Sequence, residues 1–171
     1  QDKHGVWTLD WSASWSEVKK TDLDPASFTL LRCALKDKNG IYNLRDGNKI
    51  SSDVKNYVEI EGSEYAKDAK TIYFRNTPLS GADLKTFTVM PPASVEETSI
   101  YAKDSIHVYW FGNVIEGADP KTFAYSKRDN SFATDKSALF YGGEKVKGSI
   151  DLKTFVPLED DSYIKDKKHV S

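Results

Sequence analysis

Apolar and polar positions recur along the chain in short runs with a period of 31 to 36 residues. Each period begins with an aspartate, which we call the anchor aspartate: Asp2, Asp37, Asp68, Asp104, Asp135 and Asp166. Four positions later stands an aliphatic residue: Val6, Ile41, Ile72, Val108, Leu139 or Val170. In five of the six periods an aromatic residue comes next: Trp7, Tyr42, Tyr73, Tyr109 and Phe140. Recurrence at this spacing indicates a repeat architecture.

A second pattern, an aspartate four positions before an aromatic residue, lies between successive anchors. We call its members the cap aspartate and the plug aromatic: Asp24/Phe28, Asp53/Tyr57, Asp83/Phe87, Asp119/Phe123 and Asp151/Phe155. Asp119 precedes Pro120, and aspartate followed by proline is typical of the start of a helix. We therefore predict a one-turn helical cap in each period, in which the cap aspartate is structural and the plug aromatic turns inward.

The stretch 101–123 shows the expected elements most clearly. Residues 101–103 and 107–111 are rich in residues that favour strands, and Asp104 between them can open a tight turn by bonding backbone amides. Gly112 and Asn113 supply a second turn, and a third short strand follows around Ile115. The sequence thus predicts a three-stranded meander that ends in the cap.

The predicted fold is all-β: tandem copies of this meander with one-turn helical caps, stacked as an open twisted array. A small propeller-like ring is the alternative, ranked second because propeller blades usually need about 40 residues or more. We expect one repeat domain over residues 1–171, with copies at about 1–31, 32–60, 61–90, 91–126 and 127–158 and a partial copy at 159–171.

The aliphatic and aromatic rows must point to opposite faces of their strand, because neighbouring side chains alternate. An outward aromatic row would form a ladder on which sugars could stack. In a two-layered or closed array both faces are buried, and burial of both faces is what we expect. Trp7, Trp11 and Trp15 share one face of the atypical first copy, either as a cap of the array or as a ligand-stacking surface.

The same residues carry a resemblance to a known family. The run Asp37-Lys38-Asn39-Gly40-Ile41-Tyr42 resembles the motif of the bacterial DKNYY repeat family, and its Asp-Lys opening recurs at Asp2, Asp135 and Asp166. Asp68 and Asp104 depart from it, being followed by Ala69 and Ser105. The resemblance implies a bacterial repeat protein and brings no catalytic residue with it.

Composition argues against several classes of function. The chain has 24 basic and 26 acidic residues without a long block of one sign, whereas nucleic-acid binding needs a concentrated basic surface. No stretch approaches the roughly 20 apolar residues of a membrane span. Cys33 is the only cysteine, and its expected role is that of a small buried residue. The chain begins with Gln1, from which we expect a removed leader and a periplasmic or extracellular location.

Catalytic motifs are missing from the sequence. His4, His107 and His169 lie far apart in the repeats, and no ligand spacing for zinc or calcium occurs. No nucleophile motif or phosphate loop is present. Most aspartates are already explained by their roles in turns and caps, which leaves few candidates for catalysis. We therefore expect no enzyme activity, no metal site and no cofactor.

The function predicted is a non-catalytic protein-binding module of a bacterial exported protein. An immunity-type protein that neutralises a toxin is one form of it. The alternative is a carbohydrate or cell-wall binding module that uses exposed aromatic rings. Candidate binding residues are Trp7, Trp11, Trp15, Trp110 and Tyr109, and Glu96 and Glu97 on a long link that also contains Pro91 and Pro92.

Overall fold

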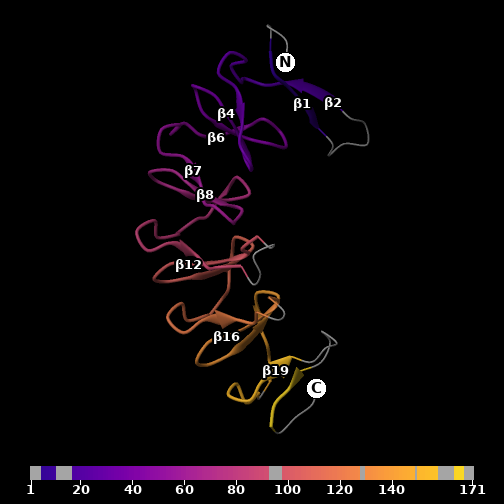
Figure 1. Ribbon diagram of the computed structural model, residues 1–171, viewed down its shortest axis with the longest axis vertical. Helices are drawn as coiled ribbons and strands as arrows, with labels where there is room; N and C mark the ends of the chain where they lie inside the picture. The colour runs from indigo at the N-terminus through magenta and orange to yellow at the C-terminus, as the bar shows by residue number, and fades with distance from the viewer. Residues whose placement is uncertain are drawn as a thin grey trace. The chain divides into compact units, whose positions relative to one another are not determined.

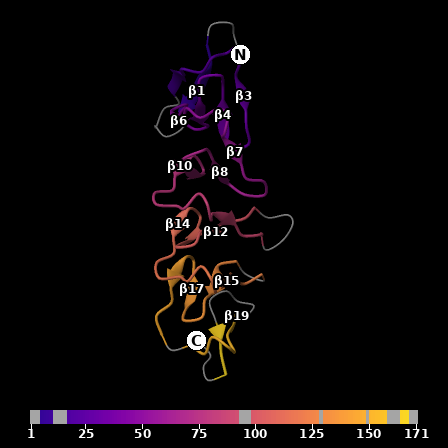
Figure 2. The same cartoon turned by 90° about the vertical axis from the view of Figure 1, so that its left-hand side faces the viewer.

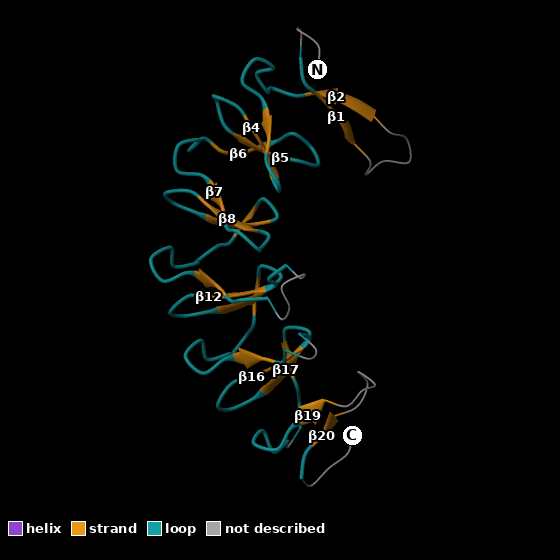
Figure 3. Ribbon diagram, viewed as in Figure 1, coloured by secondary structure: helices purple, strands orange, loops and turns teal. Residues whose placement is uncertain are grey.

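The structure, a computed structural model, describes residues 5–10, 17–92, 98–127, 130–148, 150–157 and 164–167. These residues form strands, turns and loops, and none of them is helical (Figure 3). The all-β, repeated character predicted from the sequence is confirmed. The chain divides into two compact units, Gln1–Ser80 and Gly81–Ser171.

The first unit holds a two-stranded hairpin and two four-stranded antiparallel sheets (Figure 1). The hairpin pairs β1 (Trp7–Asp10) with β2 (Glu17–Lys20). The next sheet consists of β3 (Thr29–Leu30), β4 (Ala34–Lys36), β5 (Ile41–Asn43) and β6 (Lys49–Ser51). The last consists of β7 (Val58–Glu59), β8 (Tyr65–Lys67), β9 (Ile72–Phe74) and β10 (Thr77–Pro78). Neighbours in a sheet are neighbours in sequence, so each sheet is a meander.

The second unit has the same organisation (Figure 2). One sheet consists of β11 (Thr88–Val89), β12 (Tyr101–Lys103), β13 (Val108–Trp110) and β14 (Asn113–Val114). The next consists of β15 (Ala124–Tyr125), β16 (Phe132–Thr134), β17 (Leu139–Tyr141) and β18 (Glu144–Lys145). A pair of strands, β19 (Val156–Pro157) and β20 (Ile164–Lys165), follows.

Each meander has four strands, not the three that the sequence predicts. The additional strand consists of the two residues after the plug aromatic, which pair with the next strand of the chain. Val58 and Glu59 of β7, for instance, pair with Lys67 and Ala66 of β8. The predicted copy boundaries therefore cut the sheet, because they leave these two residues at the end of the preceding copy.

The predicted helical cap is a single hydrogen-bonded turn. The amide of the plug aromatic donates to the carbonyl of the cap aspartate in Tyr57, Phe87 and Phe123, at 2.9 to 3.1 Å. The next residue then enters a strand, so the turn is not continued. A segment this short does not supply the further turns that a helix needs to be stable.

Both rows of the repeat are buried, as the sequence predicts for a stacked arrangement. Tyr42, Tyr73, Tyr109 and Phe140 are at most 3% exposed, and so are Ile41, Ile72, Val108 and Leu139. The aromatic row faces the plug that precedes its own sheet. The ring centroids of plug and row are 6.0 Å apart for Tyr57–Tyr73, 5.9 Å for Phe87–Tyr109 and 5.8 Å for Phe123–Phe140. The plugs therefore lie in equivalent surroundings.

The aliphatic row faces the plug of the following sheet. In the first unit Ile41 of β5 shares a core with the plug Tyr57 and with Tyr73 of β9. In the second unit Val108 of β13 shares a core with Phe123 and with Phe140 of β17. Within each unit, successive sheets thus pack face to face with one plug aromatic between them.

Three hairpins are closed by two residues with positive φ, the geometry that matches the twist of paired strands. The pairs are Arg75–Asn76, Phe111–Gly112 and Gly142–Gly143. The predicted turn at Gly112–Asn113 is therefore displaced by one residue, and Asn113 begins β14. Gly143 also needs to lack a side chain, since a Cβ there would lie 2.6 Å from the ring of Trp110.

The hydroxyl of the plug Tyr57 is buried and has no hydrogen-bond partner among the described residues. The other four plugs are phenylalanine. An unsatisfied buried polar group costs about 1–3 kcal/mol, so we expect Tyr57→Phe to raise the free energy of unfolding by about 1 kcal/mol. Tyr109→Phe is the matched control: it removes the same atom, but from a hydroxyl that donates to Asp104, and should lower stability by about 2 kcal/mol. Urea unfolding of both variants measures the two effects, and a loss of stability in Tyr57→Phe contradicts the prediction.

Candidate functional site

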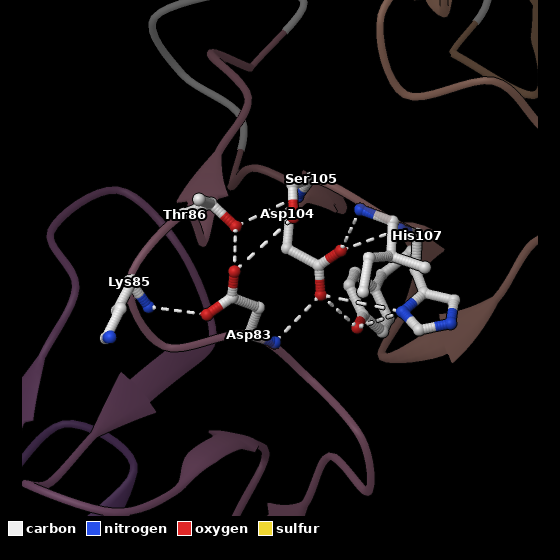
Figure 4. Close-up of polar contacts among 8 residues, drawn as sticks. Asp83, Lys85, Thr86, Asp104, Ser105 and His107 are labelled. Carbon is white, nitrogen blue, oxygen red and sulfur yellow. Dashed lines mark hydrogen bonds and ion pairs between the residues drawn. The ribbon is translucent and has the colours of Figure 1, made fainter.

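The most connected polar group of the sheet β11–β14 is the anchor Asp104, which is 4% exposed (Figure 4). Its Oδ1 accepts the backbone amides of Ile106 and His107 at 2.7 and 2.6 Å. Its Oδ2 accepts the amide of the cap Asp83 at 3.0 Å and the hydroxyl of Tyr109 at 2.8 Å. One carboxylate therefore closes a turn, holds the aromatic row and binds the preceding cap. We call this arrangement the aspartate hub.

The hub recurs with small changes at the other described anchors. The amides of Asp24, Asp119 and Asp151 donate to Oδ2 of Asp37, Asp135 and Asp166 at 2.7, 2.9 and 2.7 Å. At Asp68 a serine bridges the two groups: the amide of Asp53 donates to the hydroxyl of Ser51, and that hydroxyl donates to the carboxylate of Asp68. The tyrosine hydroxyl is missing where Phe140 stands, and there the hydroxyl of Ser137 donates to Asp135 instead.

The five cap aspartates predicted from the sequence all lie in the turn before a sheet. Asp83 is typical of them: its Oδ1 accepts the amide of Lys85 at 3.0 Å and its Oδ2 accepts the hydroxyl of Thr86 at 2.7 Å (Figure 4). The Thr86 hydroxyl in turn accepts the amide of Ser105, the residue after the anchor. Cap and anchor are thus joined by two routes.

The lysine of the Asp-Lys motif neutralises a cap. Lys38 lies 2.7 Å from the carboxylate of Asp24, and Lys136 lies 2.8 Å from that of Asp119. Two copies depart from the motif. In one of them Ala69 has no side-chain donor, and in the other the hydroxyl of Ser105 lies 3.4 Å from the carboxylate of Asp83. The ion pair therefore gives the motif's second residue a structural role.

Hydrogen bonding lowers the pKa of the anchor Asp104 and of the cap Asp24. Burial acts to raise the pKa of Asp104, but the amides of Asp83, His107 and Ile106 and the Tyr109 hydroxyl outweigh it and lower the pKa to about 2. The hydrogen bond from Lys38, with those of Ala26 and Ser27, lowers the pKa of Asp24 to about 2. Asp104 and Asp24 are therefore both ionised at neutral pH.

His107 is the titratable neighbour of Asp104 in the hub, and its side chain is partly exposed. Its Nδ1 lies 3.6 Å from Oδ2 of Asp104 and 3.3 Å from the hydroxyl of Tyr109. The hydroxyl of the neighbouring Ser105 donates to Asp83 and not to the imidazole, so the cluster lacks the nucleophile–base pair of a serine hydrolase. Among the described residues, no group of three or more His, Cys, Asp or Glu side chains could hold a metal ion. In the same part of the chain, no helix is long and apolar enough to cross a membrane.

The structure separates the predicted binding residues. Tyr109 is 1% exposed and donates to Asp104, so we assign it to the core instead of a binding surface. Trp110 is half-buried against the Gly142–Gly143 turn, whereas Trp7 is 54% exposed. The positions of Trp11, Trp15, Glu96 and Glu97 fall outside the described residues.

Two surface features escaped the sequence reasoning. One is a set of exposed apolar side chains on edge strands, most of them on the first strand of a sheet, which was not predicted. The other is a polar hollow beside Tyr42, lined partly by the β5–β6 hairpin. Its signal in the sequence is the length of that hairpin, which is greater than that of its counterparts.

Replacing Asp104 tests the hub. In Asp104→Asn the amide NH₂ of the new side chain faces donors, and the charge-assisted hydrogen bonds are lost. We expect the free energy of unfolding to fall by about 3 kcal/mol, since each hydrogen bond to a charged group is worth about 1.5–3 kcal/mol. The matched control is Asp46→Asn on an exposed hairpin, where one amide bonds the carboxylate. Chemical denaturation compares the two, and equal effects contradict the role of the hub.

The lowered pKa values predict acid sensitivity. Between about pH 4, the unfolded value for aspartate, and pH 2, the unfolded chain binds protons that the folded chain does not, so stability rises with pH in this window. The stabilisation is fully present above about pH 4 and is lost as pH falls through the folded pKa of about 2 for Asp104. Melting temperatures recorded by circular dichroism from pH 7 to 2 should fall mainly below pH 4. In Asp104→Asn this fall should be smaller, and an unchanged slope contradicts the assignment.

Comparison with known proteins gives one match. No curated protein and no solved structure matches the chain. The model of the DKNYY family matches residues 13–144, which is most of the sequence. The matched region contains the Asp-Lys motif at Asp37 and Asp135, whose lysines lie on the caps. The chain therefore belongs to the DKNYY family.

Proposed function

We propose that the chain is a non-catalytic protein-binding module of an exported bacterial protein, located in the periplasm or outside the cell. Its concrete form is an immunity-type protein that binds and neutralises a protein toxin. The copies form an open array, a proposal supported by the face-to-face packing of successive sheets within each unit. One observation carries the function: large apolar side chains are exposed on strands at the edges of sheets.

The edge strands of four sheets each carry such a side chain. Leu30 on β3 is 64% exposed, Val58 on β7 48%, Val114 on β14 37% and Val156 on β19 41%. Edge strands also present backbone groups to which another strand can pair. Exposed apolar side chains beside a pairing-competent backbone suit an extended segment of another protein, which gains affinity from the main chain and specificity from the side chains.

The backbone at Leu30 is oriented for such pairing. Leu30 lies opposite Leu35, and the amide of Leu31 donates to the carbonyl of Ala34. In an antiparallel ladder the bonding alternates, so the amide and carbonyl of Leu30 point away from β4. Among the described residues, the backbone hydrogen bonds outside the strand ladders involve neither group. The exposed side chain and the unpaired backbone thus coincide in one residue.

A second exposed residue, Val58, lies close to this edge. The carboxylate of Glu59 accepts the amides of Arg32 and Cys33 at 3.1 and 2.6 Å, which holds the end of β7 against the loop that follows β3. Leu30 and Val58 form what we call the first-unit edge. It joins two sheets, so a partner could contact both.

The aspartates support a non-catalytic role. The anchors use their carboxylates in turns and caps, as described above, which leaves no pair of them free for acid–base chemistry in the described hubs. A glycan-binding module is the second candidate, favoured by the exposure of Trp7, which is 54% exposed.

The first-unit edge can be tested by capture. The immobilised full chain should retain a protein from an envelope extract of the native host, and the double variant Leu30→Asp, Val58→Asp should retain at least about tenfold less of it, because a carboxylate in the contact must be desolvated. Ile106→Asp is the matched control, since Ile106 is 63% exposed and lies in a turn outside any strand. Retention should be unchanged there.

Mass spectrometry identifies the retained protein, and a toxin gene next to the coding sequence would support the immunity form. Equal loss in Ile106→Asp, or full retention by the double variant, contradicts the assignment of the edge. If no envelope protein is retained at all, the proposal that the chain is a protein-binding module is wrong.

A further inference from the structure

We propose that the hollow beside Tyr42 in the first unit is a binding site for a neutral sugar residue. The hollow has a volume of about 450 Å³ and is lined by Asp22, Asn39, Tyr42, Gly47, Asn48 and Lys49. This volume lies within the range of roughly 300–1,000 Å³ that is usual for sites of small molecules. The site is separate from the first-unit edge, because its residues lie on β5, β6, the turns beside them and the link before β3, whereas Leu30 and Val58 of the edge do not line it.

The hollow exists because this hairpin departs from the repeat. Three other hairpins connect their strands through two residues, as in the pairing of Trp110 with Asn113. Here Tyr42 pairs with Lys49, and the register shifts between Ile41 and Tyr42. The amide of Asn43 donates to the carbonyl of Asn48, which folds the longer loop on itself. Insertions in repeat proteins often lie on the binding face, and bulges re-aim side chains.

The side chains around the hollow are available for a ligand. Asp22, Asn39 and Asn48 are exposed. In the part of the chain that the structure describes, none of their side-chain oxygens or nitrogens has a hydrogen-bond partner within the protein. An amide offers both donors and an acceptor, and a carboxylate offers acceptors only. Together they can serve neighbouring hydroxyl groups, each of which donates and accepts one bond.

The charge around the hollow favours a neutral ligand over an anion. The only ammonium in the lining is that of Lys49, which donates to the carbonyl of Asn39 at 3.2 Å and lies 5.4 Å from the centre of the Tyr42 ring. Asp22 lines the same hollow, and Asp37 bonds the Tyr42 hydroxyl beneath it. A phosphate or carboxylate ligand would therefore be repelled by two carboxylates, and it would be attracted by only one ammonium, which is already hydrogen-bonded.

The methylenes of Lys49 give the hollow an apolar side beside the buried Tyr42. Tyr42 is 1% exposed and held by Asp37, so it cannot swing out to stack on a ring. The methylenes of Lys49 lie over Gly40, where a Cβ would come within 2.8 Å of the lysine chain. The C–H face of a sugar can rest on the methylenes of Lys49 while its hydroxyls bond the polar rim. The inference does not depend on the proposed protein-binding function.

A titration of the full chain with glucose, galactose, mannose and N-acetylglucosamine tests the site. We expect at least one of them to shift the side-chain NH₂ signals of Asn39 and Asn48 in ¹H–¹⁵N spectra in a saturable way. Asn48→Ala and Asp22→Asn should each weaken that affinity about tenfold, since a lost hydrogen bond in such a site is worth about 1–3 kcal/mol. Asn113→Ala is the matched control, because Asn113 is an exposed amide on β14 outside the hollow.

Glycine and sodium phosphate serve as the zwitterionic and anionic probes. Saturable shifts of Asn39 and Asn48 with either of these, and not with a sugar, would overturn the assignment of ligand class. Signals that do not move with any sugar, or an equal loss of affinity in Asn113→Ala, would overturn the site itself.

Discussion

The hydrogen bond from the amide of a cap aspartate to the buried carboxylate of an anchor aspartate is the contact on which the repeat depends. Strands of two or three residues are too short to be stable alone, and this bond, relayed through Ser51 at Asp68, fastens each sheet to the preceding turn. Asp104 shows why aspartate is required. Two oxygens at the end of a short side chain accept four donors, which compensates the loss of hydration of a buried charge. A longer glutamate would place the same oxygens out of reach of its own turn.

The hub also explains why each sheet is apolar on both faces. It holds the turn so that the plug aromatic lies against the aromatic row of its own sheet, as Phe123 does against Phe140 at 5.8 Å. The opposite face carries the aliphatic row and needs the next plug to cover it. Each repeat is thus completed by its neighbour, which is the general condition of repeat proteins, whose stability is largely a sum of neighbour contacts. A single copy has a plug but no cover for its aliphatic row.

Turns and strands that depend on residues close in sequence could be predicted. The pairing of the first strand of each sheet with the next strand could not. The turn at Asp104 and the strands around it follow from residues within seven positions of one another. The first strand of each sheet has two residues of varied character, such as Thr29–Leu30 and Ala124–Tyr125, and no pattern of its own. The turn at Phe111–Gly112 was predicted one residue too late, because φ of 47° is unusual for phenylalanine. The lone hydroxyl of Tyr57 is likewise visible only once its buried surroundings are known.

The division between repeated and unrepeated positions indicates where function is to be sought. The anchor and cap aspartates, the plugs and the two rows are engaged in holding sheets together, and the lysine of the Asp-Lys motif neutralises a cap in two copies. A motif made of such residues predicts how members of the family fold, and it does not predict what they bind. The residues that break the pattern are under no such constraint. Leu30, Val58 and the lengthened hairpin before Lys49 are among them, and all lie on the surface of the first unit. Members of the family that share the hub should therefore differ in binding through these positions, because changes there leave the contacts between copies intact.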